Sequence, residues 1–155
     1  MNYKVVGKFI SEILIVELVF MIPALLISVF CGETSSIFGF LGAMLATSLI
    51  SLVLYLLCRK AKQRFFAKEG LVCVGIGWIA LSILGALPFF ISREIPSFVD
   101  ALFETVSGFT TTGASILTNV EAMSKGMLYW RSFSHWLGGM GVLVFLLAIA
   151  PADGR

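Results

Sequence analysis

The stretch Asp100–Ser115, DALFETVSGFTTTGAS, decides the fold, because it lies between two long apolar runs and is too short and too polar to cross a bilayer. Apolar residues recur in it at helical spacing, so the sequence predicts a short amphipathic helix over Ser97–Ser107 that ends at Gly108. The strip that follows, Thr110–Ser115, carries no bulky apolar side chain. The pattern indicates a short helix that enters a membrane part-way, with an extended segment at its tip.

The rest of the composition indicates a membrane protein. Hydrophobic residues make up 59% of the 155 residues and charged residues 13%, with a mean hydropathy of +1.01, whereas soluble domains are about 45–50% apolar and about 25% charged. Each of four apolar runs is long enough to cover the ~30 Å hydrocarbon core at about 1.5 Å per residue. The runs are Phe9–Cys31, Ile37–Cys58, Leu71–Ser92 and Met127–Ala150. The predicted fold is therefore all-α: a polytopic membrane protein with four transmembrane helices plus one re-entrant helix and loop.

Charge placement predicts the topology. The loop between the second and third runs holds five basic residues, and such loops stay in the cytoplasm. They are Arg59, Lys60, Lys62, Arg64 and Lys68. The N-terminus is then also cytoplasmic, and Gly32–Ser36 and Arg93–Lys125 are external. Beside two spanning helices, this run of charge favours a topology signal over nucleic-acid binding.

Three segments follow from this topology. Residues 1–58 form a two-helix transmembrane hairpin, 59–69 a cytoplasmic basic loop, and 70–155 a helix–loop–helix repeat. Within the repeat, the transmembrane helices span 71–92 and 127–150, the short helix 97–107, and the loop strand 110–115.

No enzyme motif such as HExxH, GxSxG or a phosphate-binding lysine loop is present, so the sequence does not predict an enzyme. Asp100 and Glu104 lie one helical turn apart, and we expect them to line an external vestibule or to hold the loop. We expect Arg131 to reach the outer interface and His135 to be hydrogen-bonded.

Other polar and small residues of the helices have less specific roles. For Glu12 and Glu17 in the first run, an interfacial or protein-packed position and an ion-handling role both remain open. The three cysteines show no CxxC spacing, and we expect them to be small buried residues.

The polar strip has the chemistry of an ion-coordinating segment. A short helix directs its C-terminal carbonyls and partial negative charge at its tip, and a Thr/Gly strip there offers oxygens to a desolvated cation. Gly113 suits a backbone whose carbonyls must turn one way. The layout predicts a pore helix and a selectivity filter. Three glycines of the last run, Gly138, Gly139 and Gly141, indicate either tight packing or a helix bend beside a pore.

Several segments together resemble the N-terminal third of the pore-forming subunits of Trk/Ktr-type potassium transporters. They are KEG at 68–70, GALPF at 85–89, DALFETVSGFTTTGAS at 100–115, YWR at 129–131 and HWLGGMGVLV at 135–144. The resemblance implies two leading helices and then four helix–pore loop–helix repeats around one pore. It assigns the filter to Thr111, Thr112, Gly113, Ala114 and Ser115, with K⁺ at the first three. From the sequence pattern itself, we expect Asp100, Glu104, Gly108 and Thr110 to belong to the pore helix and vestibule.

The resemblance also implies partners. The chain would be a fragment that needs the C-terminal repeats of the same polypeptide. The full-length subunit would lie in the bacterial plasma membrane, form a homodimer, and bind a cytosolic nucleotide-binding regulatory subunit. It implies no cofactor besides the transported K⁺. Two alternatives stay open from the residues: a small non-transporting membrane protein with a structural re-entrant turn, and a short channel that assembles four copies.

Overall fold

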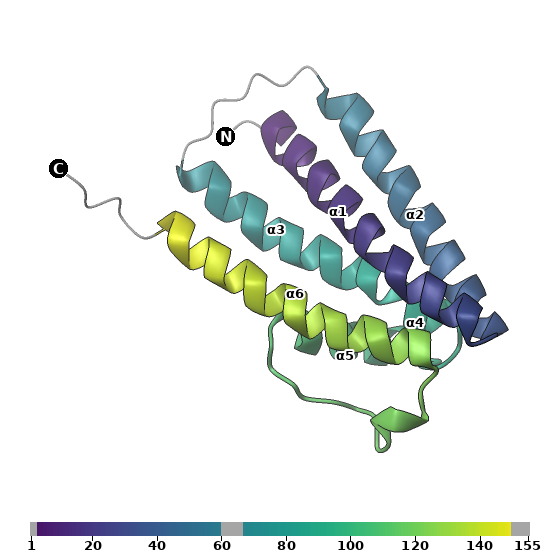
Figure 1. The fold of residues 1–155 in the computed structure, drawn as a ribbon. Coiled ribbons are helices and arrows are strands. Elements are labelled where there is room, and N and C mark those ends of the chain that lie inside the picture. The colour runs from purple at the N-terminus through teal and green to yellow at the C-terminus, as the bar shows by residue number, and fades with distance from the viewer. Residues whose placement is uncertain (1–2, 60–66, 150–155) are drawn as a thin grey trace.

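The computed structural model describes residues 3–59 and 67–149, and these form helices joined by loops, without a strand. The all-helical class is therefore confirmed. In chain order the elements are α1 Tyr3–Phe30, α2 Thr34–Cys58, α3 Ala67–Gly85, α4 Leu87–Ile91, α5 Phe98–Phe109, the 3-10 helix η1 Val120–Ala122, and α6 Lys125–Ile149 (Figure 1).

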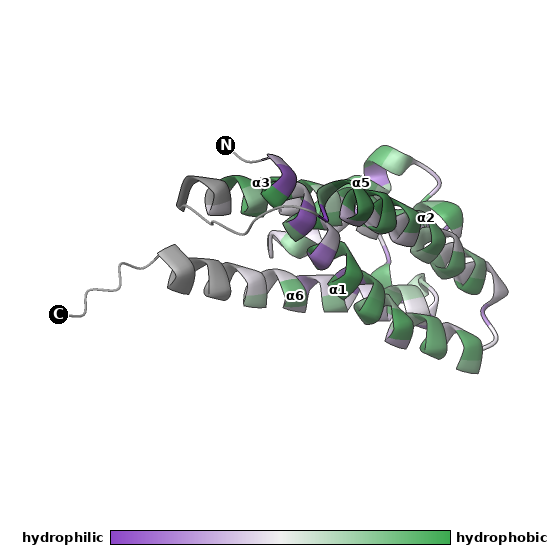
Figure 2. Cartoon of the chain, turned by 90° about the horizontal axis from the view of Figure 1, so that it is seen from above, coloured by the Kyte–Doolittle hydropathy of each residue, from purple (hydrophilic) through white to green (hydrophobic). Residues whose placement is uncertain are grey.

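Three helical segments among the described residues are long and apolar enough to cross a membrane: Tyr3–Phe30, Thr34–Cys58 and Val72–Ile91. Most of their described residues are green in Figure 2, the colour of hydrophobic residues. The fourth predicted span coincides with α6, but the side chains beyond residue 141 lie outside the described part, so its crossing stays a prediction. The centre of the predicted basic loop, residues 60–66, also lies outside it.

The third apolar run is not one helix over 71–92, as its composition predicts, because it breaks at Ala86 between α3 and α4. Pro88 lies just after the break and has no N–H to donate to the preceding turn. Next to the break, the indole Nε1 of Trp130 donates to the carbonyl of Gly85 over 2.9 Å. Proline thus interrupts the helix, and a side chain from α6 satisfies a carbonyl beside the interruption.

The interior is formed mainly where α1, α2, α4 and α6 meet. The largest fully buried side chains of this cluster are Trp130, Phe40, Phe89, Met21 and Met127. α5 packs against α6, α3 and α4 at one end of these helices. The transmembrane helices therefore hold the short helix in a fixed place.

One end of the molecule is joined by polar contacts between segments far apart in sequence. The carboxylate of Glu33 accepts hydrogen bonds from the backbone N–H groups of Lys125 and Gly126, at 2.7 and 3.1 Å. The hydroxyl of Ser35 donates to the carbonyl of Ser92 over 2.6 Å. The α1–α2 turn, the segment after α4 and the start of α6 therefore lie at the same end, as the alternating topology requires.

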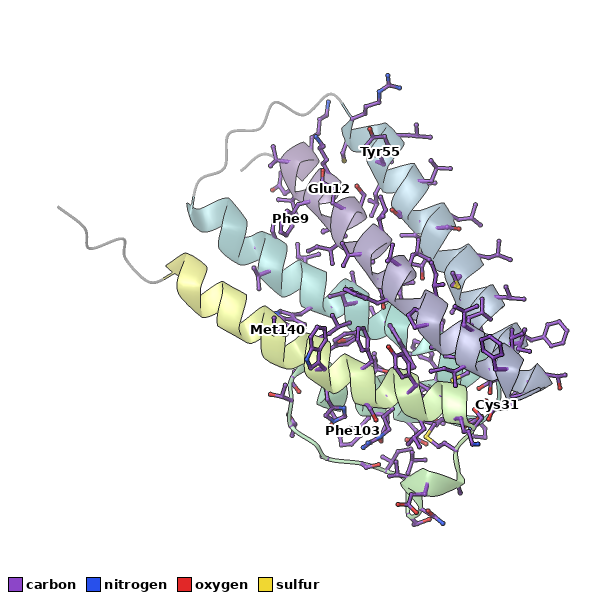
Figure 3. All side chains as sticks on the ribbon, viewed as in Figure 1. Phe9, Glu12, Cys31, Tyr55, Phe103 and Met140 are labelled. Carbon is purple, nitrogen blue, oxygen red and sulfur yellow. The ribbon has the colours of Figure 1, made fainter. Side chains whose placement is uncertain are left out.

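The three cysteines are free, as expected. Cys58 and Cys73 are buried, but Cys31 is exposed, so the expectation of burial is wrong for that residue. Figure 3 shows the reason: Cys31 lies at the turn of the hairpin, at the opposite end of the α1–α2 pair from Glu12 and Tyr55. A residue at the end of a hairpin has few helical neighbours to cover it.

Candidate functional site

The short helix α5 begins as the sequence predicts and ends later. Ser97 is its N-cap, and its hydroxyl accepts from the N–H of Asp100 at 3.4 Å. Gly108 does not end the helix, which continues to Phe109. A Cβ at Gly108 would overlap the hydroxyl of Ser134, so this glycine allows α6 to approach α5 closely rather than stopping the helix.

The amphipathic pattern of α5 is real, but only part of its apolar side faces outward. Val99 and Phe103 are 72% and 47% exposed, whereas Phe98 and Leu102 pack against the hydrophobic core. The buried residues of α5 are Ala101, Glu104, Thr105, Ser107, Gly108 and Phe109. In a membrane protein an apolar outer face is compatible with lipid or with further helices, and a polar inner face can be satisfied by hydrogen bonds.

The strip after α5 folds back on the end of that helix. The N–H groups of Thr111 and Thr112 donate to the carbonyls of Gly108 and Ser107, at 2.9 and 3.0 Å. Two residues of the strip have positive φ, Thr111 at 57° and Gly113 at 75°. Positive φ is unusual for a β-branched residue such as threonine, and the hydroxyl of Thr111 donates to the preceding carbonyl over 2.7 Å.

The strip presents some of its carbonyls without a protein donor. The carbonyl of Ala114 accepts from the hydroxyl of Ser107 at 2.5 Å, so it is engaged by α5. In the described part of the chain, no donor reaches the carbonyls of Thr111, Thr112 or Gly113. These three residues are exposed. Three consecutive carbonyls are thus free to bind a ligand at the C-terminal end of a helix.

A buried carboxylate holds the strip in place. Glu104 is 1% exposed, so it does not line an open vestibule; of the two roles expected for it, it holds the loop. The hydroxyl of Ser115 donates to both of its oxygens at 3.0 Å, and the N–H of Ile116 donates to one at 3.2 Å. The outgoing part of the strip is therefore fixed to the middle of α5. The hydroxyl of Thr110 bonds that of Thr112 at 2.8 Å, which adds a local link.

Arg131 completes this arrangement, and the expectation that it reaches the outer interface is wrong. Its Nε lies 2.5 Å from Oε1 of Glu104, and its side chain is only 15% exposed. A buried carboxylate needs such a partner, because an unpaired buried charge is strongly destabilising. His135 is hydrogen-bonded, as expected: its Nδ1 donates to the carbonyl of Arg131 over 2.9 Å.

The three glycines of α6 lie in a continuous helix and have different surroundings. A Cβ at Gly138 would overlap the carbonyl of Phe109, the last residue of α5, and one at Gly141 would lie 2.9 Å from Trp78. A Cβ at Gly139 would meet only a methyl group of Thr111, at 3.9 Å. Close packing accounts for two of the glycines, and a helix bend stays a prediction.

Sequence reasoning missed the supporting residues Ser107, Arg131 and Trp130. A buried tryptophan normally finds a partner for its N–H, and a carboxylate on the polar face of a membrane helix needs a cation. Both residues therefore signalled that they need a partner. The spacing of residues in the sequence does not identify those partners, which are the Gly85 carbonyl for Trp130 and Arg131, 27 residues away, for Glu104.

The chain thus combines long apolar helices with a short internal helix and an exposed strip at its C-terminal end. The family model described as "TrkH: Cation transport protein" matches residues 36–155, and the chain belongs to this family. It is a membrane protein.

Individual relatives agree with the family. The chain is 32% identical over 137 residues to an uncharacterised cation transporter of Methanocaldococcus jannaschii, covering 88% of this chain and 28% of that protein. It is 31% identical over 157 residues to the Trk system potassium uptake protein TrkH of Halomonas elongata, covering 99% and 32%. The crystal structure of the potassium transporter TrkH from Vibrio parahaemolyticus matches with a TM-score of 0.89 and 27% identity, over 100% of this chain and 33% of that one. The chain thus spans about a third of the length of these relatives.

Proposed function

We propose that this chain forms the first helix–pore loop–helix repeat, with its leading hairpin, of a potassium uptake pore in the plasma membrane. The observation that carries the proposal is the exposed segment Thr111–Gly113, whose three carbonyls have no donor among the described residues. The residues that follow it, Ser115 and Ile116, are hydrogen-bonded to Glu104 of α5. The relatives that are named for potassium uptake support K⁺ as the ion.

The mechanism follows from the chemistry of the strip. A K⁺ ion that has lost its water needs several oxygens at once, and backbone carbonyls provide them without charge. The C-terminal end of α5 adds a partial negative charge beside the ion. The residues that coordinate K⁺ in this proposal are Thr111, Thr112 and Gly113. Ala114 and Ser115 continue the strand, and their bonds to Ser107 and Glu104 fix its position.

One such strip surrounds an ion on one side only. The proposed pore therefore needs three further repeats, supplied by the same polypeptide or by other chains. A dimer of complete subunits and a cytosolic nucleotide-binding regulatory subunit belong to this proposal through the resemblance alone. In the proposed orientation, the N-terminus and the basic loop are cytoplasmic, and the strip opens to the outside.

A matched pair of glycines tests the filter. Gly113 has φ +75° and Gly32 has φ +70°, and a Cβ at either position would meet nothing within 4 Å. Serine at either site strains the backbone by about 1–2 kcal/mol, but only Gly113 lies in the strip. The complete protein would be expressed in a bacterium that lacks potassium uptake, and Rb⁺ uptake would be measured against Na⁺ competition, normalised to the protein in the membrane.

We expect Gly113→Ser to relax the preference for Rb⁺ over Na⁺, whereas Gly32→Ser should lower protein abundance at most. An unaltered preference in Gly113→Ser at normal uptake would overturn the filter assignment and favour a structural turn. The chain of 155 residues alone, in liposomes, should carry no K⁺ flux. Selective flux from it would favour an assembly of four copies.

A further inference from the structure

Glu17 is an ionisable residue near the middle of a membrane-spanning helix. It lies 14 residues after the first residue of α1 and 13 before the last (17 − 3 = 14; 30 − 17 = 13). At about 1.5 Å per residue, each end of the helix is about 20 Å away. Ionisable residues at this depth are rare in membrane proteins, and they commonly mark a functional site.

The carboxyl group of Glu17 is buried by the helices of this chain and receives no hydrogen bond. The residue is 1% exposed, and no donor among the described residues reaches Oε1 or Oε2. Glu104, the other buried carboxylate among the described residues, accepts hydrogen bonds from three groups, the Ser115 hydroxyl, the Ile116 N–H and the Arg131 guanidinium. A carboxylate without donor or cation is far less stable in such a place than a neutral acid.

No cation neutralises Glu17 within the described ranges. On its own helix, Lys8 pairs with Glu12 at 4.0 Å. The helix α2 carries no charged residue, and α3 carries none from Val72 onward. On α6, Arg131 pairs with Glu104 of α5. No hydrogen bond or ion pair joins Glu17 to the other described titratable groups on these elements, which are Tyr3, Lys4, Tyr55, Cys58, Cys73, Asp100, Lys125, Tyr129 and His135.

The carboxyl group lies next to the end of α5, across Gly85 of α3. A Cβ at Gly85 would lie 3.1 Å from Oε1 of Glu17, 3.1 Å from the methyl group of Thr105 and 3.0 Å from a ring carbon of Phe109. The hydroxyl of Thr105 is engaged by the carbonyl of Ala101 at 2.8 Å. No group of three or more His, Cys, Asp or Glu side chains that could hold a metal ion occurs among the described residues, whereas a proton needs no further ligand.

We propose that Glu17 is a proton-binding site inside the membrane, and that its bound proton keeps α1 packed at Gly85 of α3, where the last turn of α5 also packs. When the proton passes to water, the charge left on Glu17 needs water or a cation, so the helices must separate around Gly85. Phe109 leads directly into the strip Thr110–Ser115, and this separation therefore disturbs the strip. The link to ion passage rests on the proposed function, but the proton site itself does not.

Infrared spectroscopy tests the proton site without any transport assay. The intact protein in phosphatidylcholine vesicles would be compared at neutral and alkaline pH, and the readout is the C=O stretching band of a protonated carboxylic acid. We expect this band at neutral pH in the wild type and in Glu12→Gln, the matched control on the same helix, whose side chain is 53% exposed. The band should be lost in Glu17→Gln, retained in Glu17→Asp, and unchanged when N-methylglucamine replaces potassium.

Absence of a Glu17-dependent acid band at neutral pH would overturn the proposal. A Glu17-dependent carboxylate band that responds to potassium would replace it with a cation site. Rb⁺ uptake tests the link: Glu17→Gln, which is permanently neutral, should keep its uptake at alkaline pH, while the wild type and Glu12→Gln lose uptake several-fold. Equal pH dependence in all three refutes the link. If the wild type takes up no Rb⁺ at any pH, the proposed function fails and the infrared result still decides the proton site.

Discussion

Replacing Glu104 with glutamine should release the strip that follows α5. The carboxylate accepts from Arg131, Ser115 and Ile116 at once. The amide side chain of Glu104→Gln keeps only one acceptor oxygen. Its NH₂ group is a donor, so it cannot accept hydrogen bonds from the groups that donate to the carboxylate. Removing one partner of a buried ion pair costs about 3–5 kcal/mol. Because each 1.4 kcal/mol is about a factor of ten in an equilibrium constant, local opening of the strip should increase at least about a hundredfold.

Hydrogen–deuterium exchange of the protein in lipid nanodiscs measures this opening directly, because the N–H of Ile116 is bonded to Glu104. The matched control is Asp100→Asn, which changes a carboxylate one turn earlier in α5, where loss of its charge at the helix start costs about 0.3–1 kcal/mol. The double variant Glu104→Gln with Arg131→Gln should regain part of the protection, since no buried charge is left unpaired. Similar exchange at Ile116 in Glu104→Gln and Asp100→Asn would refute this reasoning.

Two further predictions concern packing and topology. Gly138→Ala should lower the thermal stability of the purified protein by several degrees and Gly139→Ala should not, because only the first substitution places a methyl group against the carbonyl of Phe109; equal melting temperatures would contradict this packing. A membrane-impermeant maleimide added to intact cells should label Cys31, the exposed cysteine, and labelling only after lysis would reverse the proposed orientation.

The sequence predicted the long helices and the short helix α5 in their order, but not the break between α3 and α4, because hydrophobic length and helical periodicity depend on local composition. It did not predict which face of α5 is buried. Of the apolar residues that recur at helical spacing, Val99, Phe103 and Val106 are exposed. Phe98 and Leu102 pack against the core, and Phe109 is buried. Periodicity gives the angular position of a stripe and not the medium that it faces.

The supporting contacts of the site could not be predicted for a different reason. Arg131 near the start of an apolar run is compatible with an interfacial position, and only the folded arrangement brings it to Glu104. Glycine has the backbone freedom to end or bend a helix, so Gly108 and Gly138 could have done either. Instead, each lies where α5 and α6 approach closely. Such choices depend on the crossing of two helices, which is a property of distant residues.

The bond between Glu33 and the start of α6 also has a consequence for the order of assembly. Ninety-two residues separate Glu33 from Lys125, and a growing chain completes its N-terminal parts first. The carboxylate is therefore in place at the end of the hairpin before α6 is synthesised. When α6 arrives, two of its unpaired N–H groups meet an acceptor that was made earlier. The leading hairpin thus supplies an acceptor for the repeat, and a chain that lacked it would begin α6 without this cap.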